Sequence, residues 1–358
     1  MNIDGAEVTI EKVHYNDLRD LENIFTKEFG EEVNSEIIKQ RVHRVRQFYY
    51  ILRPLSNVSL WVKNLFNIYI IRVGLNLAGF IQVSYLSEKQ IHLDYIAISK
   101  KYRGKGIGSV VLRALLENIA EKNNYDVILE VRSDNPAKRL YERLGFVTQA
   151  QVLHYEKSFS SEAVLDTETS SELKLQPVKE NDRLQIYRLY RASIPCRLQQ
   201  VVRREYQEFN PSLFIRNLNW LKNRLMHNEA QAYVVRIGER IIASVDVRSY
   251  PKATFHVLSM ILHPRYEKYR KTILSKALMG LAEKYRKGSV STTIYNDSIA
   301  KQEILENLGF AQQEVYYLML RLSNREYKEN NLDRQEKYGM YPNMKYGKRI
   351  SKLPKLPL

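Results

Sequence analysis

The sequence predicts an α/β protein in which one mixed-sheet domain occurs twice. Strand-like and helix-like patterns follow the order β-α-α-β-β-β-α-β-α, with one or two strands after Gly145, and the second half repeats this order. The hexapeptides at 141–146 (Tyr-Glu-Arg-Leu-Gly-Phe) and 305–310 (Leu-Glu-Asn-Leu-Gly-Phe) lie 164 residues apart, which indicates a duplication. Antiparallel strands followed by a β-α-β crossover favour a mixed sheet with helices on its faces.

In the first half, alternation predicts a strand over 8–13, and apolar residues at helical spacing predict helices over 16–29 and about 34–51. Strands are expected over 68–73, 78–85 and 91–98, and the Gly-Leu-Asn-Leu turn between the first two indicates a hairpin. A helix over 108–122, a strand over 127–131 and a helix from about Asn135 complete this half.

The second half repeats the pattern. We expect strands over 173–178, 232–237, 241–248, 254–262 and 290–295, and helices within 181–226 and over 271–287 and 298–308. The segment around 160–172 is small and polar, as linkers are, and the last 36 residues carry few aliphatic side chains. The predicted organisation is therefore a domain over 1–159, a linker over 160–172, a second domain over 173–322 and a basic tail over 323–358.

Composition limits the class of protein. The chain has 358 residues, of which 44% are hydrophobic and 27% charged, so it is long enough for two globular domains. One cysteine, Cys196, excludes a disulfide framework and a cysteine-rich zinc site, and we expect no metal. Neither a secretory signal nor a membrane span is evident, so we expect a cytoplasmic protein without a membrane partner.

The net charge of +16 is unevenly distributed. Residues 1–160 carry +3, residues 161–322 carry +8 and the tail carries +5. The basic second half and tail favour an anionic partner such as RNA, a phosphorylated metabolite or an acidic protein. A solvated basic surface without a partner explains the same charge.

The most informative motif is Arg103-Gly104-Lys105-Gly106-Ile107-Gly108, between an expected strand and an expected helix. The glycines allow close approach of a ligand, and backbone N–H groups at the start of the helix, with Arg103 and Lys105, suit a pyrophosphate. A Walker loop is excluded because Gly106 follows Lys105, and the G-x-G-x-G spacing differs from a dinucleotide fingerprint.

Residues 91–146 resemble the GNAT acetyltransferase superfamily. Its signature, Arg/Gln-x-x-Gly-x-Gly/Ala, matches residues 103–108 at every position, and a second motif from Asn135 to Phe146 lies at the family's spacing. In that motif Asn135 is expected to be a helix N-cap and Pro136 the first helical residue. The resemblance covers roughly residues 5–158 and implies acetyl-CoA (coenzyme A) as the cofactor. It implies these cofactor-binding residues: Ile96, Ala97, Ile98, Arg103, Gly104, Lys105, Gly106, Ile107, Gly108, Ser109, Asn135 and Ala137.

The resemblance also implies catalytic roles. Tyr141 matches the tyrosine that protonates the departing thiolate. Strand alternation places His92, Asp94, Ile96 and Ile98 on one face. His92 occupies the position of a carboxylate base in some members, and imidazole has a suitable pKa. Asp94 is the other candidate base, and it would equally orient a water or bind the substrate ammonium, so the base stays open.

The offset of 164 residues shows which residues of the second half correspond to the motif residues of the first. Its counterparts carry none of the chemistry: Arg103 falls on Glu267, Gly104 on Lys268, Gly106 on Arg270, Gly108 on Thr272, Asn135 on Ile299 and Tyr141 on Leu305. Leu308-Gly309-Phe310 survives. The second domain is therefore expected to be a degenerate GNAT-like copy.

The predicted function is acetyl-CoA-dependent N-acetyl transfer to an amine of a small molecule or protein, by direct attack in a ternary complex. The alternative is a non-catalytic protein that senses coenzyme A or binds RNA or another anionic polymer. The size of the acyl group stays open.

Overall fold

The computed structural model describes residues 2–3, 6–29, 64, 66–160, 173–202, 204–225, 227–250 and 254–323. The helix expected over 34–51 lies outside these residues. So do the linker over 160–172 and the tail over 323–358, apart from Ser160 and Ser323.

The first half has the expected order of elements. Its strands are β1 (Asn2–Ile3), β2 (Ala6–Lys12), β3 (Ile68–Val73), β4 (Asn76–Tyr85), β5 (Gln90–Ile98), β6 (Asp126–Arg132) and β7 (Val147–Ser160). Its helices are α1 (Leu18–Phe29), α5 (Ile107–Leu115), continued by π-type turns over Leu116–Glu121, and α6 (Lys138–Arg143). One strand of 14 residues, β7, follows Gly145.

The second half follows the same plan. Its strands are β8 (Gln176–Pro177), β9 (Glu229–Ile237), β10 (Arg240–Tyr250), β11 (Phe255–Leu262), β12 (Lys287–Tyr295) and β13 (Ala311–Arg321). Its helices are α7 (Arg183–Ser193), α8 (Tyr206–Phe209), α9 (Leu213–Leu225), α10 (Arg270–Tyr285) and α11 (Ile299–Asn307), with a short 3-10 helix at Cys196–Leu198. The strand expected over 173–178 is reduced to two residues, which pair with the edge of β9.

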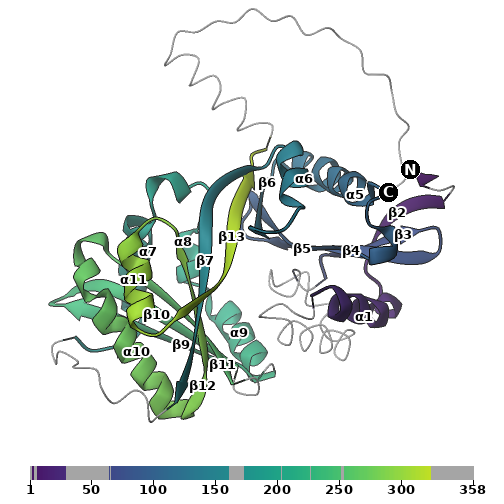
Figure 1. Cartoon of the computed structure of the whole chain (residues 1–358). Coiled ribbons are helices and arrows are strands. Elements are labelled where there is room, and N and C mark those ends of the chain that lie inside the picture. The colour runs from purple at the N-terminus through teal and green to yellow at the C-terminus, as the bar shows by residue number, and fades with distance from the viewer. Residues whose placement is uncertain are drawn as a thin grey trace, which may run out of the picture.

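All thirteen described strands form one sheet, in the order β1-β2-β3-β4-β5-β6-β13-β7-β12-β11-β10-β9-β8. The last strand, β13, lies between β6 and β7 of the first half, and β7 lies between β13 and β12 of the second (Figure 1). Each half therefore contributes one strand to the sheet of the other. The two parallel pairs, β5 with β6 and β11 with β12, occupy equivalent places in the two halves.

Each of the two exchanged strands has a segment that is buried on both faces, around Val152–Leu153 in β7 and Leu318–Leu320 in β13. Leu153 and Tyr155 of β7 belong to the core of the second half, whereas Ala150 and Val152 face a smaller cluster at the junction. This alternation is the period of a strand that is covered on both sides. The junction is thus part of the hydrophobic core and not a linker between separate domains.

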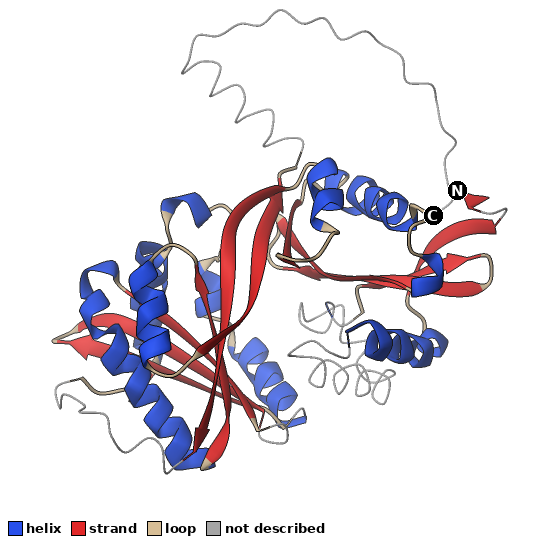
Figure 2. Cartoon of the chain, in the orientation of Figure 1, coloured by secondary structure: helices blue, strands red, loops and turns tan. Residues whose placement is uncertain are grey.

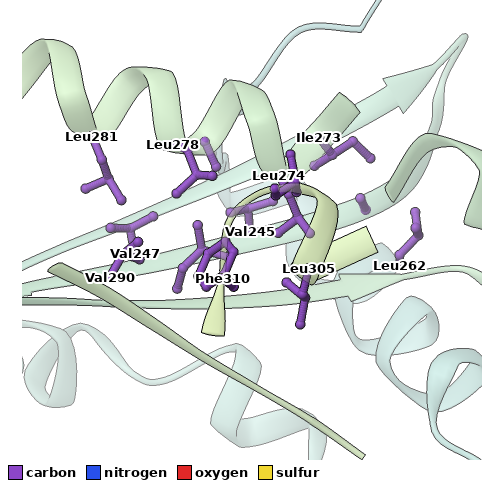
Figure 3. Packing of buried hydrophobic residues seen from close by; sticks show 14 of the residues in the cluster. Val245, Val247, Leu262, Ile273, Leu274, Leu278, Leu281, Val290, Leu305 and Phe310 are labelled. Carbon is purple, nitrogen blue, oxygen red and sulfur yellow. The ribbon is translucent and has the colours of Figure 1, made fainter. Parts of the chain in front are cut away.

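Helices cover both faces of the sheet (Figure 2). In the first half α5 packs on one face, where its core includes Ile107 and Leu112, and α1 lies on the other (Figure 1). In the second half Leu278 and Leu281 of α10 pack above Val245 and Val247 of the sheet (Figure 3). None of the helices in the described ranges combines the length and apolar character that crossing a bilayer requires.

Candidate active site

A β-bulge in the centre of β5 organises the site. Gln82 of β4 pairs with Tyr95 and Val83 pairs with Leu93, so Asp94 is an extra residue in β5. An extra residue reverses the alternation of side chains beyond it. Ile91 and Leu93 before the bulge therefore share the α5 face with Ile96 and Ile98 after it. The expectation that His92 and Asp94 share a face with Ile96 and Ile98 is wrong, because the extra residue at the bulge shifts the alternation of the side chains that follow it.

The bulge brings three polar side chains together on the opposite face. Asp94 accepts a hydrogen bond from the Ser84 hydroxyl through Oδ2, and its Oδ1 lies 2.8 Å from Nδ1 of His92. Burial alone would lower the pKa of His92, but the hydrogen bond and charge of Asp94, with the charge of Glu130, hold that pKa above its ordinary value. With Nδ1–H bonded to Asp94, Nε2 of His92 becomes the proton acceptor.

Beyond the bulge β5 leaves its parallel neighbour. The last pair between β5 and β6 is Leu93 with Leu129, although β5 continues to Ile98. The N–H of Ser99 donates to Ala78 O on β4, so alternation directs the N–H of Ala97 toward β4 and those of Ile96 and Ile98 toward the opening. Nε of Arg103 donates to Ile98 O across 2.8 Å at this edge. Ile96 and Ile98, and not Ala97, thus present backbone groups to the opening.

The glycine loop directly follows this edge. Gly104 and Gly106 have φ of +77° and +78°, a conformation that favours glycine, and Gly106 is the N-cap of α5. The first hydrogen bond of the helix runs from Ser109 N to Gly106 O, so the N–H groups of Ile107 and Gly108 precede the helical ladder. The loop combines donors, the positive end of a helix and basic side chains, which fits a diphosphate.

The second motif lies beside the loop. Asn135 Oδ1 accepts from Ala137 N at 2.9 Å, but α6 begins at Lys138. Asn135 therefore caps tight i→i+3 turns that lead directly into α6, in which Lys138 N and Arg139 N donate to Asn135 O and Pro136 O. The expectation of Pro136 as the first residue of the α-helix is wrong, because these turns occupy its place. A Cβ added at Gly108 would lie 3.9 Å from Cδ2 of Leu140 in α6, so the two motifs are neighbours.

Tyr141 points into the core of the first half. Its side chain is buried, and its ring lies edge-on to Phe146 with centroids 5.8 Å apart. Burial raises the pKa of Tyr141 to about 12, so its hydroxyl keeps its proton at neutral pH.

Sequence reasoning missed Glu130. It is exposed on the inner strand β6 and lies on the His92 face, next to Ile128, which pairs with His92. Burial lowers the pKa of His154 in β7, and the negative charge of Glu130 opposes that effect. Burial raises the pKa of Tyr295 in β12, and the charge of Glu130 adds to that effect. Strands of both halves therefore lie close to Glu130. Within the described part of the chain, no cation pairs with Glu130. The sequence did contain a signal for Glu130, because it is the one charged residue in the otherwise apolar run Val-Ile-Leu-Glu-Val at 127–131.

The counterpart region of the second half is filled by its own side chains. Arg270 forms two hydrogen bonds with Glu267, at 2.6 and 2.8 Å, where the first half has its glycine loop. Leu305, the counterpart of Tyr141, packs in the hydrophobic core (Figure 3). His256 pairs with Ser249 at 2.8 Å, as His92 lies opposite Ser84, but the pairing of β10 with β11 runs without a bulge.

Comparison with known proteins agrees with this geometry. A family model described as "Acetyltransferase (GNAT) family" matches residues 19–146. This chain carries a GNAT domain. That domain contains the bulged strand, the glycine loop and Tyr141.

The curated relatives match between 14% and 41% of this chain. Mycothiol acetyltransferase of Corynebacterium aurimucosum is 46% identical over 52 residues, which are 14% of this chain and 17% of that protein. N-alpha-acetyltransferase 30 of Schizosaccharomyces pombe is 26% identical over 149 residues, 41% of this chain and 89% of that protein. The matches to two other relatives, from Corynebacterium glutamicum and Sulfurisphaera tokodaii, span 29% and 41% of their length.

Solved structures match nearly the whole chain. A tandem GNAT protein from the clavulanic acid biosynthesis pathway has a TM-score of 0.58 at 11% identity, covering 88% of this chain and 98% of that one. A GCN5-related N-acetyltransferase from Sphaerobacter thermophilus has a TM-score of 0.57 at 13% identity, with coverage of 88% and 95%. At these identities the likeness shows the fold, and that fold extends over both halves.

Proposed function

We propose that this protein is an N-acetyltransferase that moves an acetyl group from acetyl-CoA to an amine. The observation that carries the proposal is the position of the glycine loop at the end of β5. The same strand carries the His92–Asp94 pair, and the backbone N–H groups of its residues Ile96 and Ile98 point away from β4. Named acetyltransferases among the relatives support acetyl transfer as the reaction.

The residues of the loop fit acetyl-CoA. An added Cβ at Gly104 or Gly106 would meet no heavy atom within 4 Å, so the backbone is open to a ligand there. The N–H groups of Ile107 and Gly108 would hold the diphosphate, and the backbone of Ile96 and Ile98 the pantetheine arm. Acetyl-CoA, when bound, supplies the activated acetyl group.

We assign the base to His92 and a positioning role to Asp94. Asp94 bonds Nδ1, so Nε2 of His92 is left to accept a proton from the acceptor amine, and the raised pKa strengthens the base. The Ser84 hydroxyl holds the second oxygen of Asp94. Tyr141 donates the proton that leaves with the thiol, because its hydroxyl stays protonated at neutral pH.

Glu130 is assigned to the acceptor. An amine arrives as an ammonium ion at neutral pH, and an exposed carboxylate on the face of the base attracts it. The second half takes no diphosphate in this proposal, since the ion pair of Arg270 with Glu267 occupies the counterpart of the glycine loop. The protein would then bind one acetyl-CoA per chain.

Calorimetry with acetyl-CoA tests the cofactor site. Gly106→Glu places a carboxylate in the diphosphate cradle and is expected to reduce affinity at least a hundredfold. Gly238→Glu is the matched control, because Gly238 also has positive φ (+57°) and open space, but lies in the β9–β10 turn. Equal affinity in both variants, or two acetyl-CoA molecules per chain, would contradict the proposal.

A further inference from the structure

A cavity of about 400 Å³ lies in the second half, outside the GNAT domain. One wall is the face of α7 that carries Tyr187, Tyr190 and Arg191 at helical spacing. The other wall consists of five residues of the chain that follows: Gln199, Gln200, Val202, Arg204 and Glu205. Its volume falls in the range of small-molecule sites.

The walls are held in place by defined contacts. The Tyr190 hydroxyl donates to Val202 O across 2.6 Å and so joins the two walls. Leu198 and Val201 are buried in the junction cluster, where Ile128 of β6 also packs. The cavity is therefore anchored to the strand that carries Glu130.

Two guanidinium groups line the cavity. Arg204 lies over the rings of Tyr190 and Phe209, 5.7 and 5.8 Å from their centroids, and 3.6 Å from a carboxylate oxygen of Glu208. Arg191 has no ion-pair partner among the described residues. Glu205 lines the cavity as well, and Glu208 pairs with Arg204, so the positive charge of the cavity that is left without a counter-charge in the described residues is that of Arg191. Guanidinium forks bind phosphate and carboxylate groups, and the tyrosines add flat apolar surface.

The cavity adjoins the acceptor side of the proposed active site. Gln200, in its wall, accepts a hydrogen bond of 2.6 Å from Nε2 of Gln90, the first residue of β5 and two residues before His92. The Gln90 side chain is fully buried on the His92 face. Tyr295 of β12 lies within electrostatic range of both Glu130 and Arg204, so the acidic side chains of this face and the cavity are neighbours.

We propose that this cavity binds an anionic group of the acceptor, a phosphate ester or a carboxylate, while the acceptor amine lies at Glu130 and His92. The proposal rests on the proposed acetyl transfer for the direction of the acceptor. Binding of the anion itself does not depend on that transfer. The acceptor is thus an amine that carries a negative charge at its far end.

Direct binding to the full-length protein is the first test. Phenyl phosphate and benzoate, which carry no amine, are titrated by calorimetry, and the tighter of the two identifies the anionic group. Arg191→Gln and Arg204→Gln are each expected to weaken binding about tenfold. Arg197→Gln is the control, because Arg197 is exposed on the neighbouring 3-10 helix and does not line the cavity. Failure of both probes to bind, or equal binding in all three variants, would overturn the proposal.

Measurements of turnover distinguish failure of the anion-binding proposal from failure of the proposed acetyl transfer. 6-Aminohexanoic acid is compared with its amide, and 6-aminohexyl phosphate with 6-aminohexanol, as acceptors for acetyl-CoA. The acceptor with the anionic end is expected to have the higher kcat/KM, and Arg204→Gln to remove most of that preference. Turnover without such a preference overturns the cavity assignment and leaves acetyl transfer standing. Anion binding without turnover of any amine overturns acetyl transfer and the assignment of the anion to an acceptor.

Discussion

Asp94 contacts two side chains through its two carboxylate oxygens. Oδ1 holds Nδ1 of His92, and Oδ2 accepts from the Ser84 hydroxyl. A carboxylate bonded to one ring nitrogen fixes the tautomer of an imidazole and raises its basicity. In the proposed mechanism, the basicity of His92 therefore depends on a residue that need not touch the substrate.

Replacing this carboxylate tests the assignment. Asp94→Asn removes the charge that raises the pKa of His92, so kcat is expected to fall by about 10²-fold. The acid limb of the pH–rate profile should also move to lower pH, because a less basic imidazole loses its proton earlier. Glu117→Gln, an exposed carboxylate in the helical turns after α5, is the control. A fall in kcat with an unmoved acid limb would show that Asp94 acts in another way.

His256 predicts how stability depends on pH. Burial lowers its pKa, with a smaller contribution from Lys284 that Glu229 opposes, and Nε2 has no hydrogen-bond partner among the described residues. Below about pH 6.5, the ordinary pKa of imidazole, His256 is protonated in the unfolded chain but still neutral in the folded protein. The contribution of His256 to stability is thus present above that pH and is lost as the pH falls.

Thermal unfolding measures this dependence. The Tm is expected to drop as the pH falls from about 7.5 to about 5.5, and His256→Gln should reduce the drop. His154, whose pKa burial also lowers, acts in the same direction, whereas the raised pKa of His92 acts in the opposite one. An unchanged drop in His256→Gln would assign the effect to His154.

At the scale of elements, the approach of β4 to β5 decides where the bulged strand lies. A Cβ on Gly79 would lie 2.1 Å from the backbone oxygen of Ala97. No side chain fits at that distance, so β5 would have to shift. Glycine is required here for space and not for a special φ.

Gly79→Ala is therefore expected to destabilise the protein by about 1–3 kcal/mol, the usual cost of an overpacked site. Gly280→Ala is the matched control, because Gly280 is exposed in α10 with no atom near its added Cβ. That change should stabilise the protein by up to about 1 kcal/mol. Urea denaturation of both variants measures the difference, and equal stability would contradict the close approach.

Periodicity predicted most elements, because a helix or a strand repeats within a few residues. The strand at 91–98 and the helix after Gly106 were both found in this way. The bulge at Asp94 was not, because it depends on pairing with β4. Glu130 was missed for a similar reason: its carboxylate faces His92 only when β6 lies beside β5.

At the scale of the whole molecule, β13 joins the two halves. It pairs with β6 on one side and with β7 on the other. Its last residue, Arg321, donates to Leu144 O across 2.9 Å and pairs with Glu121 beyond α5. The second half thus supports the end of α6, the helix that carries Tyr141.

Removing β13 is expected to unfold both halves. A chain ending at residue 310 leaves the edges of β6 and β7 unpaired, and exposed strand edges promote aggregation. Deletion of residues 324–358 is the control, because it leaves β13 intact. Size-exclusion chromatography and acetyl-CoA binding measure the outcome. A fragment of residues 1–160 that stays monomeric and binds acetyl-CoA with full affinity would contradict the interdependence of the halves.

The sequence by itself determined the duplicated order of elements and the glycine loop that precedes a helix. These features follow from local periodicity and from the backbone freedom of glycine, which act over a few residues. The tertiary structure alone decided the exchange of β7 and β13, the bulge that separates His92 from Ile96, and the cavity beside Arg204. Each of these depends on pairing or packing between segments far apart in the chain, and the energy of such contacts does not reside in any single segment.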